Sequence, residues 1–157
     1  MNIKLLVIGK TDEPYLQAGI DVYVQRLKHY VPFEMEVIPV AKEKGTVTAD
    51  STRERESTAI LKHVAKADRI VLLDEHGTQH TSIGFSQYMQ KQMNAGVRNL
   101  VFVIGGAYGF ALSVYAAAHD KISLSAMTFN HQMVRLFFVE QLYRAYTILH
   151  HEPYHNE

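Results

Sequence analysis

The chain has 157 residues, of which 47% are hydrophobic and 20% are charged, and this composition excludes intrinsic disorder. Its 16 basic and 16 acidic side chains give a formal net charge of zero, so the chain is not a polycation, although a local basic patch could still bind nucleic acid. The absence of cysteine excludes disulfides and thiolate catalysis, and we expect one domain over residues 1–157.

The apolar run at residues 3–8 is too short to span a membrane, so we expect it to be the first strand of a cytoplasmic protein without membrane partners. The predicted strands are 3–8, 34–40, 69–74, 100–104 and 121–124, and Pro39 predicts a sheet edge or a strand end. The predicted helices are 11–30, 50–66, 81–94, 110–118 and 131–149. Residues 41–50 and 75–80 are expected to be loops. Alternating strands and helices predict an α/β fold, with a mostly parallel sheet of five to six strands and helices on both faces.

The residues of most interest lie where three predicted strands end. Leu73 lies at the end of one strand, Gly105 follows another, and the segment 124–129 begins at the end of the last. Ligands of parallel sheets bind beyond the carboxyl ends of the strands, and glycine lets backbone approach a ligand closely. The three segments therefore predict one pocket for a small-molecule cofactor.

The glycine cluster at 105–109 could also be a simple strand-to-helix turn. It is not the dinucleotide fingerprint, because its first two glycines are adjacent, and it lacks the Gly-Lys-Ser/Thr ending of a P-loop. The letters His-Glu-Pro-Tyr-His at 151–155 match the zinc motif H-E-x-x-H. Pro153 disfavours the helix that this motif requires, so we expect no metal there.

The last predicted helix, 131–149, is apolar on nearly every face. Its own sheet can cover only one face, so we expect a second subunit to cover another, giving a homodimer. Glu140 and Arg144 stand four residues apart and could simply pair. Arg135 and Arg144 could alternatively bind a phosphate or a carboxylate.

Several motifs together resemble one family. They are the IGGAYGF run, the LSAMTF loop followed by HQMVR, the EQLYRAY helix, the PYH tail, the MNIKLLVIGK start and the LDEHG loop. The chain resembles the bacterial ribosomal RNA large subunit methyltransferase H family, of the SPOUT class, over essentially its whole length. Asn130 departs from the proline expected before the His-Gln pair.

The resemblance implies a C-terminal deep trefoil knot, a homodimer and the cofactor S-adenosylmethionine. It implies methylation of N3 of a pseudouridine in helix 69 of 23S rRNA, on the assembled 70S ribosome. The implied cofactor contacts are Leu73, Gly105, Leu124, Ser125, Ala126, Met127, Thr128 and Phe129.

The implied chemistry needs no metal, because a sulfonium is already a strong methyl donor, but a base would help to remove the imide proton. His155, beside Tyr154 on a tail that could reach a partner's pocket, is the first candidate base, and His131 is the second. Arg144 could stabilise negative charge on the imide oxygens. Each also has a structural alternative: His131 could cap its helix, and His155 could be exposed.

Two other functions stay open. A flavin or nicotinamide enzyme could use the same type of sheet, and a non-catalytic ribosome-associated dimer could have the same sequence pattern. A rim of Lys42, Lys44, Arg53 and Arg55 is the expected contact for RNA if the substrate is a ribosomal cleft.

Overall fold

The computed structural model describes residues 1–40 and 42–156; the first residue of the predicted 41–50 loop and Glu157 lie outside the described residues. The strands are β1 (Asn2–Ile8), β2 (Phe33–Ile38), β3 (Arg69–Gln79), β4 (Asn99–Ile104) and β5 (Asp120–Ser123). The helices are α1 (Pro14–Leu27), α2 (Ala49–His63), α3 (Ser82–Asn94), α4 (Leu112–Ala117) and α5 (Met133–Leu149). Each predicted strand and helix is therefore present, with ends shifted by a few residues.

The strands form one five-stranded parallel sheet in the order β2-β1-β4-β3-β5. This confirms the α/β prediction, and β2 is an edge strand that stops before Pro39, as the proline predicted. The central strands β1 and β4 are almost wholly buried, which explains their continuous apolar sequences.

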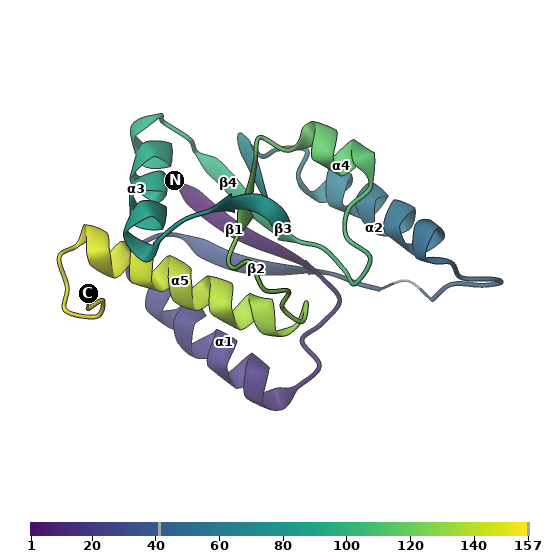
Figure 1. Ribbon diagram of the computed structural model, residues 1–157, viewed down its shortest axis with the longest axis horizontal. Helices are drawn as coiled ribbons and strands as arrows, with labels where there is room; N and C mark the ends of the chain where they lie inside the picture. Colours follow the sequence, from purple (N-terminus) through teal and green to yellow (C-terminus); the bar gives the residue numbers. More distant parts are fainter. Residues whose placement is uncertain (41, 157) are drawn as a thin grey trace.

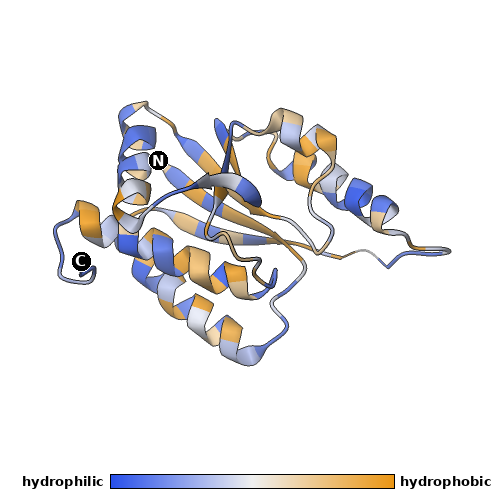
Figure 2. Cartoon of the chain, in the orientation of Figure 1, coloured by the Kyte–Doolittle hydropathy of each residue, from blue (hydrophilic) through white to orange (hydrophobic). Residues whose placement is uncertain are grey.

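Helices cover both faces of the sheet (Figure 1). On one face, side chains of α1, α3 and α5 pack around Phe102 and Phe138, whose ring centroids are 4.7 Å apart. On the other face, Ile60 of α2 and Val114 of α4 pack on Leu72 and Val103. In Figure 2 the apolar residues of these helices alternate with hydrophilic ones, as expected for helices with one face on a sheet. Within the described part of the chain, no helix has the length and apolarity needed to span a bilayer.

One predicted loop is a strand extension. Residues 75–79 continue β3, and Thr78 and Gln79 pair with Ile122 and Ser123 after a register shift that follows Leu73. Two backbones pass closely here, because a Cβ on Gly77 would lie 2.6 Å from backbone atoms of Ile122. The prediction of a loop was wrong because these residues are polar and mostly exposed, which hides the strand pattern.

Helix α5 lies between α1 and α3, and contacts both. Much of its apolar surface is therefore covered within the chain by α1 and α3, which weakens the expectation, drawn from its apolar faces alone, that a second subunit covers another face. Met133 and Phe137 stay exposed, at 40% and 39%.

Arg135 is fully buried in this helix. Its guanidinium donates to the carbonyl oxygens of Ile8 (2.7 Å) and Gly9 (2.8 Å) and to Thr11 Oγ1 (3.2 Å). The alternative that Arg135 binds a substrate phosphate was therefore wrong, since its hydrogen bonds fix the start of α5 to the end of β1.

Candidate functional site

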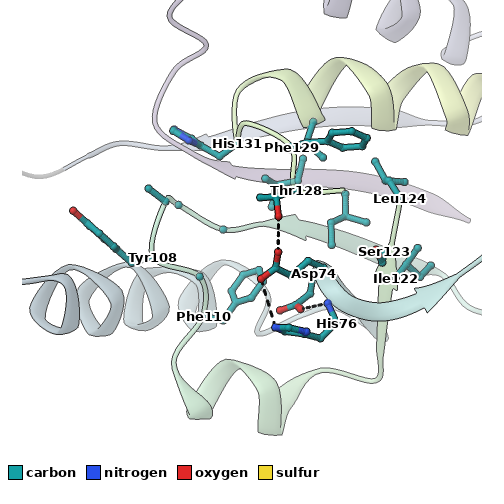
Figure 3. A pocket seen from close by; sticks show the side chains of 18 of the residues that line it. Asp74, His76, Tyr108, Phe110, Ile122, Ser123, Leu124, Thr128, Phe129 and His131 are labelled. Atoms are coloured by element: carbon teal, nitrogen blue, oxygen red, sulfur yellow. Dashed lines mark hydrogen bonds and ion pairs between the residues drawn. The ribbon is translucent and has the colours of Figure 1, made fainter. Parts of the chain in front are cut away.

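A pocket of about 440 Å³ opens beyond the carboxyl ends of β3, β4 and β5 (Figure 3). This volume is in the range of small-molecule and cofactor sites. Four segments line it: residues 73–76 from β3, 104–110 after β4, 122–124 from the end of β5, and Thr128, Phe129, His131 and Val134 from the start of α5 and the loop before it. The convergence of strand ends that the sequence predicted is thus present.

The glycine wall of the pocket is tightly packed. A Cβ on Gly105 would lie 3.0 Å from the ring of Phe110, which is buried and also lines the pocket. Gly109 adopts a positive φ of 74°, and its amide donates to the carbonyl oxygen of Gly106 (3.2 Å), which closes a tight turn. Residues 105–109 therefore form this wall, and three of its five positions, Gly105, Gly106 and Gly109, carry no side chain.

The opposite wall is acidic. Asp74 accepts a hydrogen bond from Tyr115 Oη and another from the amide of His76 (2.8 Å). Burial, followed by the hydrogen bond to Asp74, raises the pKa of Tyr115 to about 12, so its hydroxyl stays a donor at neutral pH. Glu75 accepts from Thr128 Oγ1 (3.0 Å), and this bond joins β3 to the 124–129 segment across the pocket mouth.

Not all of the predicted cofactor contacts line this pocket. Leu73, Gly105, Leu124, Thr128 and Phe129 do, whereas Ser125, Ala126 and Met127 do not. Ser125 Oγ instead accepts the amide of Met127 (3.0 Å), and its carbonyl accepts from Ser123 Oγ (2.7 Å), so the segment turns back on itself. Met127 is 77% exposed.

The predicted catalytic side chains lie in two places. His131 lines the pocket, while Arg144, Tyr154 and His155 form a cluster near the other end of α5. From the first residue of α5 to Arg144 the helix rises about 16 Å. One chain therefore does not bring the tail residues to its own pocket.

The tail cluster is held together by Glu140, which accepts hydrogen bonds from Arg144 Nη2 (2.6 Å) and Tyr154 Oη (2.9 Å). Arg144 Nη1 lies 3.2 Å from His155 Nδ1, and its guanidinium stacks over the Tyr154 ring at 4.7 Å. The Glu140–Arg144 pair confirms the simpler alternative for these two charges. Arg144 nevertheless keeps 24% of its side chain exposed, so the pair does not remove it from solvent.

Sequence reasoning missed Asp74, His76, Phe110 and Tyr115 as lining residues. A signal was available for the first two, because Asp74 ends a predicted buried strand, His76 follows two residues later, and Leu73 of that strand was already assigned to the pocket. No sequence pattern indicated that Tyr115 lines the pocket, since its position there depends on the path of the turn after β4.

A second cavity, of about 610 Å³, lies at the opposite, amino end of the sheet. Its lining includes Lys4, Lys28, His63, Lys66 and Glu34. It is larger than the first pocket, but it lies at the end of a parallel sheet where ligand sites are uncommon.

The H-E-x-x-H letters do not form the geometry of a zinc motif. Residues 151–155 are not helical, and His151 has a positive φ of 57°. Across the residues that the structure describes, no group of three or more His, Cys, Asp or Glu side chains is arranged to hold a metal ion.

Known proteins resemble the chain in sequence and in fold. The model of a family described as predicted SPOUT methyltransferase matches residues 1–155. The ribosomal RNA large subunit methyltransferase H of Flavobacterium johnsoniae is 52% identical over 157 residues, covering 100% of both chains. The protein of the same name from Christiangramia forsetii is 54% identical over 156 residues, covering 99% of each.

Solved structures agree on the fold alone. A probable methyltransferase from Bordetella pertussis superposes with a TM-score of 0.55 at 8% identity, covering 92% of this chain and 94% of that one. A probable methylase family protein from Haemophilus influenzae gives a TM-score of 0.52 at 10% identity, covering 99% of this chain and 71% of that one.

Proposed function

The chain belongs to the SPOUT methyltransferase family, in the group of ribosomal RNA large subunit methyltransferase H, and on this premise we propose that it methylates N3 of a pseudouridine in helix 69 of 23S rRNA. The substrate is the assembled 70S ribosome, and the enzyme acts in the cytoplasm. The observation that carries the proposal is the pocket at the strand ends, whose glycine and acidic walls suit a small cationic cofactor.

The pocket fits S-adenosylmethionine by shape and by charge. A Cβ at Gly105 would press on the Phe110 ring, so this wall favours glycine. Asp74 and Glu75 place carboxylates at the other wall, where they favour a ligand with a sulfonium and an ammonium group. Leu73, Gly105, Leu124, Thr128 and Phe129 would hold the cofactor, and Ser125, Ala126 and Met127 would shape the loop around it. When bound, S-adenosylmethionine supplies a methyl group on a sulfonium, which needs no metal.

The protein must also manage one proton, because N3 of pseudouridine is an imide nitrogen that loses its hydrogen as the N–C bond forms. His155 is the first candidate to accept this proton, and His131, which already lines the pocket, is the second. Arg144 and Tyr154, which contact each other beside His155, would hold the base and stabilise charge on the neighbouring oxygens.

A homodimer would bring the two places together. The tail cluster lies far from the pocket of its own chain, so the tail of one subunit would complete the pocket of the other. The exposed rings of Phe129 and Phe137, 5.1 Å apart, and the exposed Met133 form an apolar surface beside the pocket that a second copy would cover. This surface is the part of α5 and of the segment before it that the chain itself leaves exposed, and it supports the dimer.

We also infer that residues 1–157 act as one SPOUT domain and that its C-terminal part is knotted. The sheet is continuous through all five strands, which supports one domain, and the close passage of the Gly77 and Ile122 backbones, in the paired strands β3 and β5, leaves room for a threaded segment only with glycine there. Single-molecule extension from both termini tests the knot. A remaining knot makes the stretched chain shorter than its full contour, whereas full extension would exclude it.

The RNA contact is proposed for the rim that includes Lys42 and Lys44. Two of the rim's four cations have carboxylate partners, Arg53 with Asp50 (2.8 Å) and Arg55 with Glu43 (2.6 Å). The two lysines would therefore carry most of the salt-dependent binding. Unchanged ribosome affinity and salt dependence after neutralising both would exclude this contact.

Methyl transfer is tested with tritiated S-adenosylmethionine and 70S ribosomes from a strain that lacks the modification. We expect label in 23S rRNA, at the pseudouridine of helix 69, and much less with isolated large subunits. Ribosome binding without label would instead support the non-catalytic dimer. A coloured or fluorescent purified protein without label would support the flavin or nicotinamide enzyme.

A further inference from the structure

Helix α2 holds the loop that forms the glycine wall of the pocket. Arg53 Nε donates to the carbonyl oxygen of Tyr108 (2.9 Å), and the buried Ser57 Oγ accepts the amide of Ala111 (3.0 Å). Arg53, Glu56 and Ser57 stand three and four residues apart, so they share one face of the helix. This face is directed at residues 106–111, and Arg53, Glu56 and Ser57 do not themselves line the pocket.

Glu56 makes the closest approach. A Cβ on Gly106 would lie 2.6 Å from Oε1 of Glu56 and closer still to Oε2. No side chain can occupy position 106 while the carboxylate stays where it is, and the obstacle is the carboxylate itself and not the loop backbone. Gly106 thus lines the pocket and lies against the Glu56 carboxylate.

The charge of Glu56 has little compensation. Among the described residues, the group that favours its charged form is the backbone amide of Gly106, while Arg55, the preceding residue, pairs with Glu43. Burial raises the pKa of Glu56, the bond to Gly106 opposes this, and the charge of Glu43 adds to it. A half-buried carboxylate without a cation disfavours folding, so packing alone does not explain its presence.

We infer that Glu56 is a positioning residue of the cofactor pocket: its carboxylate seats the Gly106 amide and so fixes the Gly105–Gly106 wall against which the methyl donor binds. The inference rests on the proposed function, because it assigns the wall to S-adenosylmethionine. Glu56 does not line the pocket and is not proposed to touch the cofactor.

The test measures S-adenosylmethionine affinity by calorimetry in Glu56→Ala, Glu56→Gln and the control Glu54→Gln, an exposed glutamate on the same helix. We expect Glu56→Ala to weaken binding about tenfold, because the Gly106 amide loses its acceptor. Glu56→Gln keeps an acceptor without the charge, and we expect a loss of about threefold at most. Glu54→Gln should bind like the wild type.

Two further readouts separate positioning from general stability. The kcat at saturating cofactor should stay near the wild-type value while KM rises, and the melting temperature of Glu56→Gln should not fall, because a buried charge has been removed. If Glu56→Ala does not fold, the S-adenosylmethionine affinity of Glu56→Gln still tests the inference.

A double variant tests the contact itself. Gly106→Ala should weaken cofactor binding strongly, and adding Glu56→Ala should restore part of it, because the space needed by the new Cβ becomes free. Wild-type affinity in folded Glu56 variants, or strictly additive losses in the double variant, would overturn the inference while leaving the proposed function intact. Absence of binding by the wild type would instead overturn the proposed function, and the inference with it.

Discussion

At the scale of single residues, the amino end of the sheet holds a charge network with a defined pH dependence. Lys4 Nζ lies 2.5 Å from Glu36 Oε2 and 3.1 Å from Glu34 Oε1, and His63 Nδ1 lies 2.7 Å from Glu36 Oε1. The hydrogen bond from Lys4 holds the pKa of Glu36 below its ordinary 4.5, and Glu36 raises the pKa of Lys4 above 10.5. The network therefore stabilises the folded state most between these two values.

Glu36→Gln should remove the part of the stability that depends on this carboxylate. Because the folded pKa of Glu36 is lowered, its contribution to the free energy of unfolding is present above pH 4.5 and is lost as the pH falls through the lower folded pKa. The pair is partly exposed, so we expect a contribution of about 1 kcal/mol or less. The melting temperature is measured at about five pH values between pH 3 and pH 7. It should fall less steeply in acid for Glu36→Gln than for the wild type. Parallel curves would contradict the prediction.

The site residues differ in how far sequence could assign them. Gly105 and Leu73 could be placed at one pocket because the carboxyl ends of parallel strands meet at one edge. The separation of Arg144 from His131 follows from the rise of the predicted helix 131–149. The place of His155 beside Arg144 could not be foreseen, since it depends on how the tail folds back beside α5. The outward turn of Met127 likewise depends on local hydrogen bonds of Ser125, which no periodicity encodes.

At the scale of elements, α5 depends on one buried side chain. Arg135 joins the start of α5 to the carbonyl groups of Ile8 and Gly9, and burial lowers the pKa of its guanidinium. Arg135→Ala leaves buried carbonyl groups without a donor and opens a cavity, so we expect a loss of about 3 kcal/mol in the free energy of unfolding. Urea denaturation measures the loss.

The exposed Arg98→Ala is the control and should change stability by less than about 0.5 kcal/mol. A similarly small effect of Arg135→Ala would show that the contact does not anchor the helix.

The order of the strands and helices along the chain could be predicted from the sequence, whereas the pairing of the strands could not. Buried strands such as β4 carry long apolar runs, and helix caps such as Thr48 and Thr81 mark where helices begin. The extension of β3 depends on a register shift against β5, which is a tertiary contact between segments about 45 residues apart in sequence.

At the scale of the whole molecule, the proposed dimer makes each active site from two subunits. Gly105→Val would damage a pocket, and Arg144→Ala would damage a tail. In a mixed dimer of these two variants, the Arg144→Ala subunit has an intact pocket and the Gly105→Val subunit has an intact tail. These two parts form a complete active site only if the tail of one subunit reaches the pocket of the other.

Mixing the two inactive variants after unfolding and refolding together should therefore restore methyl transfer to about a quarter of the wild-type level, given random pairing. Each variant refolded alone is the control and should stay inactive. No recovery, in a mixture that light scattering shows to be dimeric, would mean that each subunit works with its own tail.

The central claim is that the methyl donor binds where residues 73, 105 and 124 meet, and titration of S-adenosylmethionine into three proteins tests it most directly. The wild type and Lys28→Ala, a change in the second cavity, should bind with the same affinity. Gly105→Val, whose side chain would collide with the Phe110 ring, should give no heat of binding while staying folded by circular dichroism. Wild-type affinity in Gly105→Val, or loss of binding in Lys28→Ala, would contradict the account.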